Sequence, residues 1–203
     1  YDNYLLGSVM FNLNDHIFRL LQDEPFFASL SRNVDKTEDR NIPTAGVRID
    51  PDTGFFELLY NPDFFEGLAT DNQRSGVLIH EFYHLVMEHI VGRLPDELAG
   101  IFDGKGDAKT QALFKLYNIA ADLSINCHIG QDNLPEIGCF PGHGPFEALP
   151  AFQSVEYYYK ELKEMNFFET ADMDINKLSL IDRINLFYKH HSDVQFAEEE
   201  KIW

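Results

Sequence analysis

The stretch that decides the fold is Gly76–Ile90, with the sequence GVLIHEFYHLVMEHI. It contains the pattern His-Glu-x-x-His at His80, Glu81 and His84. Apolar residues occupy nearly all the remaining positions of the expected helix, which is typical of a buried helix. At about 100° per residue, these three side chains and Glu88 fall within one sector roughly 100° wide. One side of a buried helix therefore carries two imidazoles and two carboxylates.

Burying these polar groups is costly unless something compensates for their lost hydration. A divalent metal ion does so directly, because two histidines one turn apart can each place a ring nitrogen on one ion. Glu81 follows His80 by one position, so it does not join the ligand pair, and it can instead act on a metal-activated water as general base. The alternative is a core helix whose His and Glu side chains are hydrogen-bonded to each other.

A third ligand is expected from a later helix. Asn118, Asp122 and Asn126 are spaced i, i+4 and i+8, so they line one helix face. Ala120 and Ala121 are small and permit close approach of another helix. We expect Asp122 to complete a His₂Asp set for Zn²⁺ with one position left for water, and Asn118 or Asn126 to orient the ligands. The alternative is that Asp122 is an ordinary exposed residue.

Four other side chains are weaker candidates. On a continuous helix His89 lies about 180° from His80, so it is expected to point away. Glu88 is on the right face but two turns on, so it is better placed to contact a ligand than to bind the ion. His128 and His143 stay open as ligands. His143 lies in the sequence PGHGP of a long loop, where it could also contact substrate or stabilise an oxyanion.

Periodicity and turn residues predict an α+β chain that is mainly helical. Helices are expected within residues 4–32, with a short one from Pro25 to near Ser31, and over about 71–93, 107–129 and 153–165. A loop is expected over 32–43, and the strands 45–50 and 55–60 around a turn predict a β-hairpin beside the His-Glu-x-x-His helix. Residues 94–107 and 130–150 are expected to be loops, and another amphipathic helix follows within 175–190. We expect one domain over 1–203, with the helices of about 153–190 packed on it.

Composition limits the partners. The 203 residues carry a net charge of −18, and the acidic residues are spread along the chain. The negative electrostatic field of these charges disfavours binding to nucleic acid or anionic membranes. It leaves open the alternative that the protein itself mimics nucleic acid. No apolar run is long enough to span a bilayer, no signal peptide is evident, and two cysteines do not make a disulfide framework. A reducing, cytoplasmic setting is expected, whereas the oligomeric state stays open.

The segment HEFYH at 80–84, followed by NIAADLSIN at 118–126, resembles the metallopeptidase domain of bacterial and phage proteins that often also carry a von Willebrand factor A-like domain. The sequences YNP at 60–62, LP at 134–135 and SVEYY at 154–158 are similar to further landmarks of that family, so the resemblance covers roughly 20–165. It implies a zincin-like fold, with His80, His84 and Asp122 as metal ligands and Glu81 as catalytic acid/base. A chain that stops at Trp203 is expected to be a short version or one part of a longer protein, located in the host cytoplasm if phage-encoded.

Two functional hypotheses follow. The first is a zinc-dependent metallopeptidase that hydrolyses peptide bonds with a metal-activated water and Glu81 as general base, while an edge strand of the hairpin at 45–60 receives an extended peptide. The second is a non-catalytic, metal-stabilised acidic module that docks a basic protein. A site closed by four protein ligands would favour the second hypothesis, because no position would remain for water.

Overall fold

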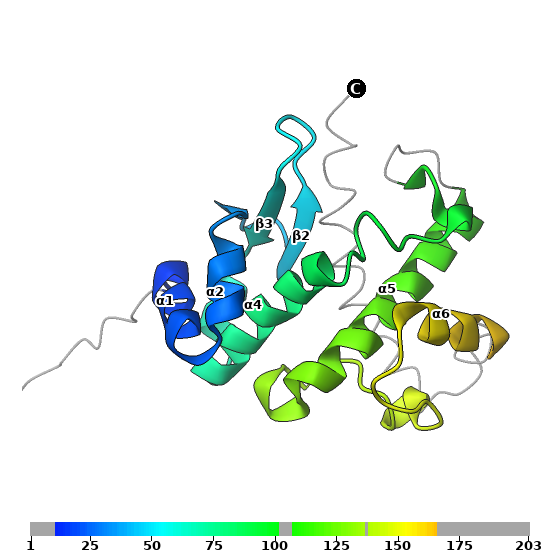
Figure 1. Cartoon of the computed structure of the whole chain (residues 1–203). Helices are drawn as coiled ribbons and strands as arrows, with labels where there is room; N and C mark the ends of the chain where they lie inside the picture. Colours follow the sequence, from blue (N-terminus) through cyan, green and yellow to red (C-terminus); the bar gives the residue numbers. More distant parts are fainter. Residues whose placement is uncertain (1–10, 102–106, 137, 166–203) are drawn as a thin grey trace, which may run out of the picture.

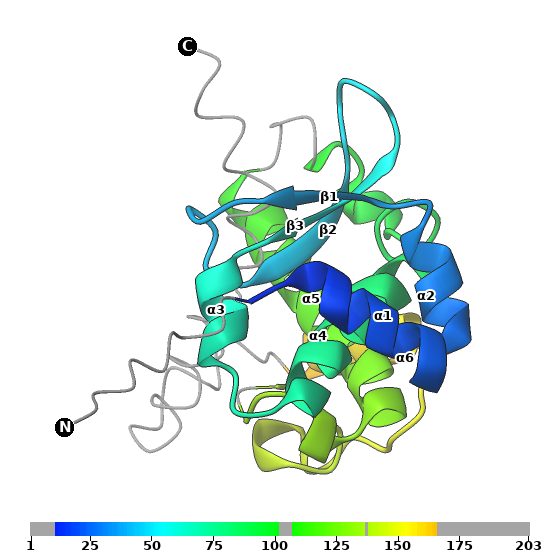
Figure 2. The ribbon, with the colours of Figure 1, turned by 90° about the vertical axis from the view of Figure 1, so that its left-hand side faces the viewer.

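A small β-sheet lies beside a set of helices in the computed structural model, which describes residues 11–101, 107–136 and 138–165 (Figure 2). The strands are β1 (Asp35–Glu38), β2 (Ala45–Ile49) and β3 (Phe56–Tyr60), in the order β1-β3-β2. β2 and β3 are antiparallel, with Ala45 opposite Tyr60 and Ile49 opposite Phe56. The predicted hairpin is confirmed, and β2 lies at one edge of the sheet.

β1 was not expected, because the sequence predicts a loop over residues 32–43, and that prediction is wrong. The strand pairs in parallel with β3, with Asp35 opposite Glu57 and Glu38 opposite Tyr60. Its residues are Asp-Lys-Thr-Glu, and three of the four are exposed. Such a strand is held by its backbone pairing, so it has no alternation of apolar residues for a sequence pattern to detect.

Helices make up most of the remaining structure. The N-terminal ones are α1 (Leu13–Asp23), α2 (Pro25–Ser31), α3 (Pro62–Gly67) and α4 (Asp71–Val86), followed by α5 (Ala108–Ile129) and α6 (Val155–Glu164). Short 3-10 turns are η1 (Asp96–Leu98), η3 (Gln131–Asn133) and η4 (Gly144–Phe146). Figure 1 shows α6 alongside α5. The amphipathic helix expected within 175–190 lies outside the described residues.

Side-chain caps fix the starts of the long helices. Thr70 Oγ1 accepts a hydrogen bond from the backbone N–H of Gln73 at 3.1 Å, so α4 begins where the sequence predicts. Asp107 caps α5 in the same way, and Ser154 caps α6. The caps of α4 and α5 therefore fix where the two helices that carry the candidate site begin.

The end of α4 differs from the prediction. The sequence predicts a helix to about 93, whereas α4 ends at Val86. Glu88 has a φ of 57°, in the left-handed region, and the chain reverses there. The backbone N–H of His89 then bonds to the carbonyl of His84 at 2.9 Å, closing a tight turn against the last residues of the helix.

Two groups of buried apolar side chains hold the fold. The N-terminal core joins α1, α2, α3, α4 and the sheet, and it includes Leu20, Phe27, Leu58, Phe65 and Phe82. The C-terminal core joins η1, α5, η4 and α6, and it includes Phe114, Ile119, Leu123, Tyr158 and Leu162. α4 belongs to the first core and α5 to the second, and the two helices lie side by side (Figure 1). In the described part of the chain no helix has the length and apolar character needed to cross a bilayer.

Candidate metal centre

Three side chains meet where α4 lies against α5. His80 and His84 extend from α4, and Asp122 extends from α5. His80 Nε2 lies 3.1 Å from His84 Nε2, and Asp122 Oδ1 lies 3.5 Å from His80 Nε2 and 3.4 Å from His84 Nε2. Asp122 and His80 are buried, and His84 is partly buried. The structure therefore brings together the three residues that the sequence predicts as ligands.

The size of this triangle fits a divalent ion. Ligands about 2.0–2.1 Å from an ion at tetrahedral angles are about 3.3 Å from one another. The three observed separations of 3.1, 3.4 and 3.5 Å are close to that value. An ion on one side of the triangle would have two nitrogens and one oxygen as ligands, and a fourth position would remain. The donor set suits zinc, although other divalent ions accept the same groups.

Burial and opposite charge act together on two of the three groups, His80 and Asp122. Burial disfavours the charged form of His80, but the carboxylate of Asp122 outweighs burial and raises the pKa of His80 to about 9. Burial acts against ionised Asp122 as well, yet the two imidazoles hold the pKa of its carboxyl group below the ordinary range. Without an ion the pair is therefore an imidazolium and a carboxylate at neutral pH. A cation bound at this group would take the place of that proton.

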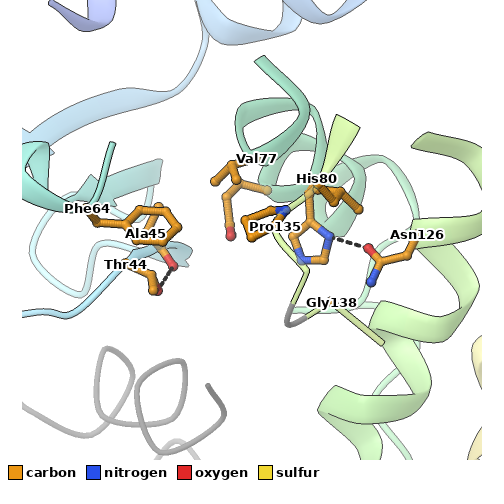
Figure 3. Close-up of a pocket in the computed structure, with 10 residues that line it drawn as sticks. Thr44, Ala45, Phe64, Val77, His80, Asn126, Pro135 and Gly138 are labelled. Carbon is orange, nitrogen blue, oxygen red and sulfur yellow. Dashed lines mark hydrogen bonds between the residues drawn. The ribbon is translucent and has the colours of Figure 1, made fainter. Parts of the chain in front are cut away.

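Asn126 fixes the orientation of His80. Its Oδ1 lies 2.8 Å from His80 Nδ1 (Figure 3). Its Nδ2 donates to the backbone carbonyl of Cys139 at 2.8 Å. Because the Asn126 oxygen accepts, His80 Nδ1 carries the hydrogen and Nε2 is left to bind an ion. The sequence left Asn118 and Asn126 as alternatives for this role. The structure places Asn126 against His80, and Asn118 is half-buried one turn before Asp122.

His89 lies beside His84, contrary to the prediction that it points away. The two Nδ1 atoms are 3.3 Å apart, and the ring of His89 is buried. The prediction assumed a helix to about 93, and the reversal at Glu88 brings the ring back to the end of α4. Burial and the neighbouring His84 lower the pKa of His89 to about 3, so its ring is neutral at physiological pH.

Glu81 is buried and lines a small cavity with His80 and Asn126. The cavity offers about 20 Å³ to the centre of a water-sized molecule, which is enough for one water. Thr44 and Ala45, at the start of β2, lie across the cavity from His80 (Figure 3). Val77, Leu134 and Pro135 make most of the remaining lining apolar.

The other candidates lie elsewhere. Glu88 is exposed in the turn after α4. His143 is exposed, and its Nδ1 bonds to the carbonyl of Pro141 at 3.0 Å. His128 is exposed near the end of α5, and its ring packs against Tyr83 and Phe152. None of these three belongs to the group of ligand atoms formed by His80, His84 and Asp122 in the described residues.

The HExxH helix faces a carboxylate on a second helix, and together these side chains form a group that could hold a metal ion. Residues 11–177 match the family model described as "Putative metallopeptidase domain". The match spans most of the chain, and the chain belongs to this family. No curated protein and no solved structure matches it.

Proposed function

We propose that the protein is a zinc-dependent metallopeptidase with a zincin-like fold. The observation that carries the proposal is the triangle of His80 Nε2, His84 Nε2 and Asp122 Oδ1, with His80 and Glu81 lining a cavity that admits one water. The family of the chain supports peptide hydrolysis, and protein or peptide is therefore the proposed substrate class.

Each residue has a distinct part in the proposed reaction. Zinc bound here would supply a Lewis acid that makes water nucleophilic at neutral pH. His80, His84 and Asp122 would hold it, with Asn126 keeping His80 in the tautomer that presents Nε2. Glu81 would take the proton from the attacking water and pass it to the leaving amine nitrogen. The apolar lining of the cavity would limit competing water around that carboxylate.

The edge strand β2 is the proposed position of the peptide. Just beyond the two ends of the hairpin ladder, the carbonyl of Thr44 accepts a hydrogen bond from the backbone N–H of Asn61 at 2.8 Å, and the N–H of Asp50 donates to the carbonyl of Phe55 at 2.9 Å. In an antiparallel ladder alternate residues bond to the neighbour, so the backbone groups of Ala45, Val47 and Ile49 face away from β3. Ala45 also lines the cavity with His80. An extended peptide added along this edge would bring a carbonyl to the site.

The geometry favours catalysis over a purely structural ion. A structural zinc site is usually closed by four protein ligands, whereas in the described residues three atoms form the group. A glutamate and room for a water adjoin His80, one of the three ligand residues. A non-catalytic, metal-stabilised module that docks a basic protein would need neither the glutamate nor the room for a water.

The test is metal analysis joined to a peptide-cleavage assay. Purified protein should hold about one zinc per chain, and Asp122→Ala should lose it. Glu81→Gln should keep the zinc and lose hydrolysis, and Glu147→Gln, which changes an exposed glutamate outside the site, should keep both. Hydrolysis retained by Glu81→Gln would refute the assigned base. Zinc retained by Asp122→Ala would refute the ligand set.

A further inference from the structure

The two histidines of the HExxH motif have different neighbours at their second ring nitrogen. His80 Nδ1 contacts the amide oxygen of Asn126, and His84 Nδ1 contacts the Nδ1 of another histidine, His89. A metal-binding imidazole holds its orientation by donating its other N–H to an acceptor, and loss of that acceptor typically weakens metal binding 10–100-fold. The Nδ1 of His84 thus needs an acceptor as much as that of His80 does.

We propose that His89 is the positioning residue of His84, and that its Nδ1 accepts the hydrogen bond that leaves His84 Nε2 free for the metal. The inference rests on the metal-binding part of the proposed function. Its geometric basis is the 3.3 Å separation of the two Nδ1 atoms, with the rings packed at a centroid distance of 5.3 Å.

The backbone of His89 is held from both sides. Its N–H bonds to the carbonyl of His84 at 2.9 Å, and its carbonyl accepts from the hydroxyl of Tyr117 at 3.1 Å. Tyr117 is buried on α5, the helix that also carries Asp122. The backbone that carries the His89 ring is therefore tied to the helix that carries Asp122.

The hydrogen-bond pattern determines the tautomer of His89. When His84 Nε2 binds an ion, its Nδ1 carries the hydrogen and donates, so His89 Nδ1 must be bare and its hydrogen lies on Nε2. His89 Nε2 is buried, and none of the described residues forms a hydrogen bond with it. The reverse pattern would put a hydrogen on His84 Nε2 and block the metal. Zinc binding and the Nε2–H tautomer of His89 are thus linked.

The first test reads the tautomer directly. In zinc-loaded wild-type protein, long-range ¹H–¹⁵N NMR correlations of the imidazole rings should show His89 with a bare Nδ1 and a protonated Nε2. A hydrogen on Nδ1 of His89 overturns the proposal. This measurement needs no variant and no activity.

The second test measures zinc affinity by competition with a chelating dye, with circular dichroism as the check on folding. His89→Phe keeps the ring but not the acceptor, and its affinity should fall 10–100-fold. His89→Gln offers an amide oxygen and should recover part of the loss, and His128→Phe, at an exposed histidine, should match wild type.

The outcomes separate the two proposals. A folded His89→Phe protein with wild-type affinity overturns the role of His89 alone. A wild-type protein that binds no zinc overturns the proposed function, and the role of His89 with it. If His89→Phe does not fold, the tautomer in the wild-type protein still decides.

Discussion

Gly76 lies where α4 meets η3, and replacing it tests how closely the two approach. A Cβ added there would lie 1.8 Å from the backbone carbonyl oxygen of Asn133 and 2.9 Å from its carbonyl carbon. Ordinary contact begins at 3.4 Å, so η3 or α4 must move by about 1.6 Å to admit the methyl group. The obstacle is backbone, so a side-chain rotation cannot relieve the clash.

Two effects of Gly76→Ala oppose each other. Alanine favours a helix interior by up to about 1 kcal/mol over glycine. Overpacking of a close contact costs about 1–3 kcal/mol, and a clash of this depth against backbone belongs at the upper end. We expect a net loss of about 1–2 kcal/mol in the free energy of unfolding. η3 leads into Leu134 and Pro135, which line the cavity beside His80, so the proposed peptide hydrolysis should fall as well.

Urea unfolding followed by circular dichroism measures the change in stability. Gly67→Ala is the matched control, because Gly67 also lies in a helix and a Cβ there would meet nothing within 4 Å. The control should be neutral or stabilised. If Gly76→Ala is as stable as Gly67→Ala, α4 and η3 are not in the close contact described, and the argument about the cavity falls with it.

Three further predictions concern the site and its surroundings. Asn126→Ala removes the acceptor for His80 Nδ1–H, so zinc affinity measured by dye competition should fall about 10–100-fold, and unchanged affinity would contradict the contact. Zinc binding should release protons and strengthen with rising pH up to the pKa of His80 at about 9, because the ion displaces a proton, and calorimetry in buffers of different ionisation enthalpy measures that release. Burial opposes ionisation of Glu156, but hydrogen bonds from Arg93 lower its pKa to about 2, below its unfolded value. The ion pair of Glu156 and Arg93 therefore stabilises the fold above about pH 4.3, and this stabilisation is lost as pH falls towards 2. It is under about 1 kcal/mol, because the pair is so exposed. Glu156→Gln should therefore flatten the acid limb of a stability–pH profile.

The ligand group could be predicted from the sequence because helical spacing is a local property. Two histidines at i and i+4 share a face whatever surrounds them, and a lone aspartate among alanines and leucine on a second apolar helix is conspicuous. The hairpin was predictable for a related reason, since its turn and its apolar residues are close in sequence.

What the sequence did not predict depends on backbone conformation or on contacts between distant segments. α4 ends at Val86, although neither glycine nor proline occurs between that residue and Gly92 to mark the end. Glu88, in the left-handed region, makes the turn instead. On a continuous helix His89 would point away from His80, whereas this turn places it beside His84. The choice between Asn118 and Asn126 depends on how α4 crosses α5, which spacing on α5 alone does not contain.

The ligands are attached to two separately packed cores, and this has a consequence for variation far from the ion. His80 and His84 are on α4, which packs in the N-terminal core, and Asp122 is on α5, which packs in the C-terminal core. Metal coordination tolerates errors of only a few tenths of an ångström in ligand distance. A methylene gained or lost in either core would therefore change the separation of the ligand atoms on α4 and α5, although it contacts none of them. The affinity of the proposed zinc site would then report small changes in the distance between the N-terminal and C-terminal cores.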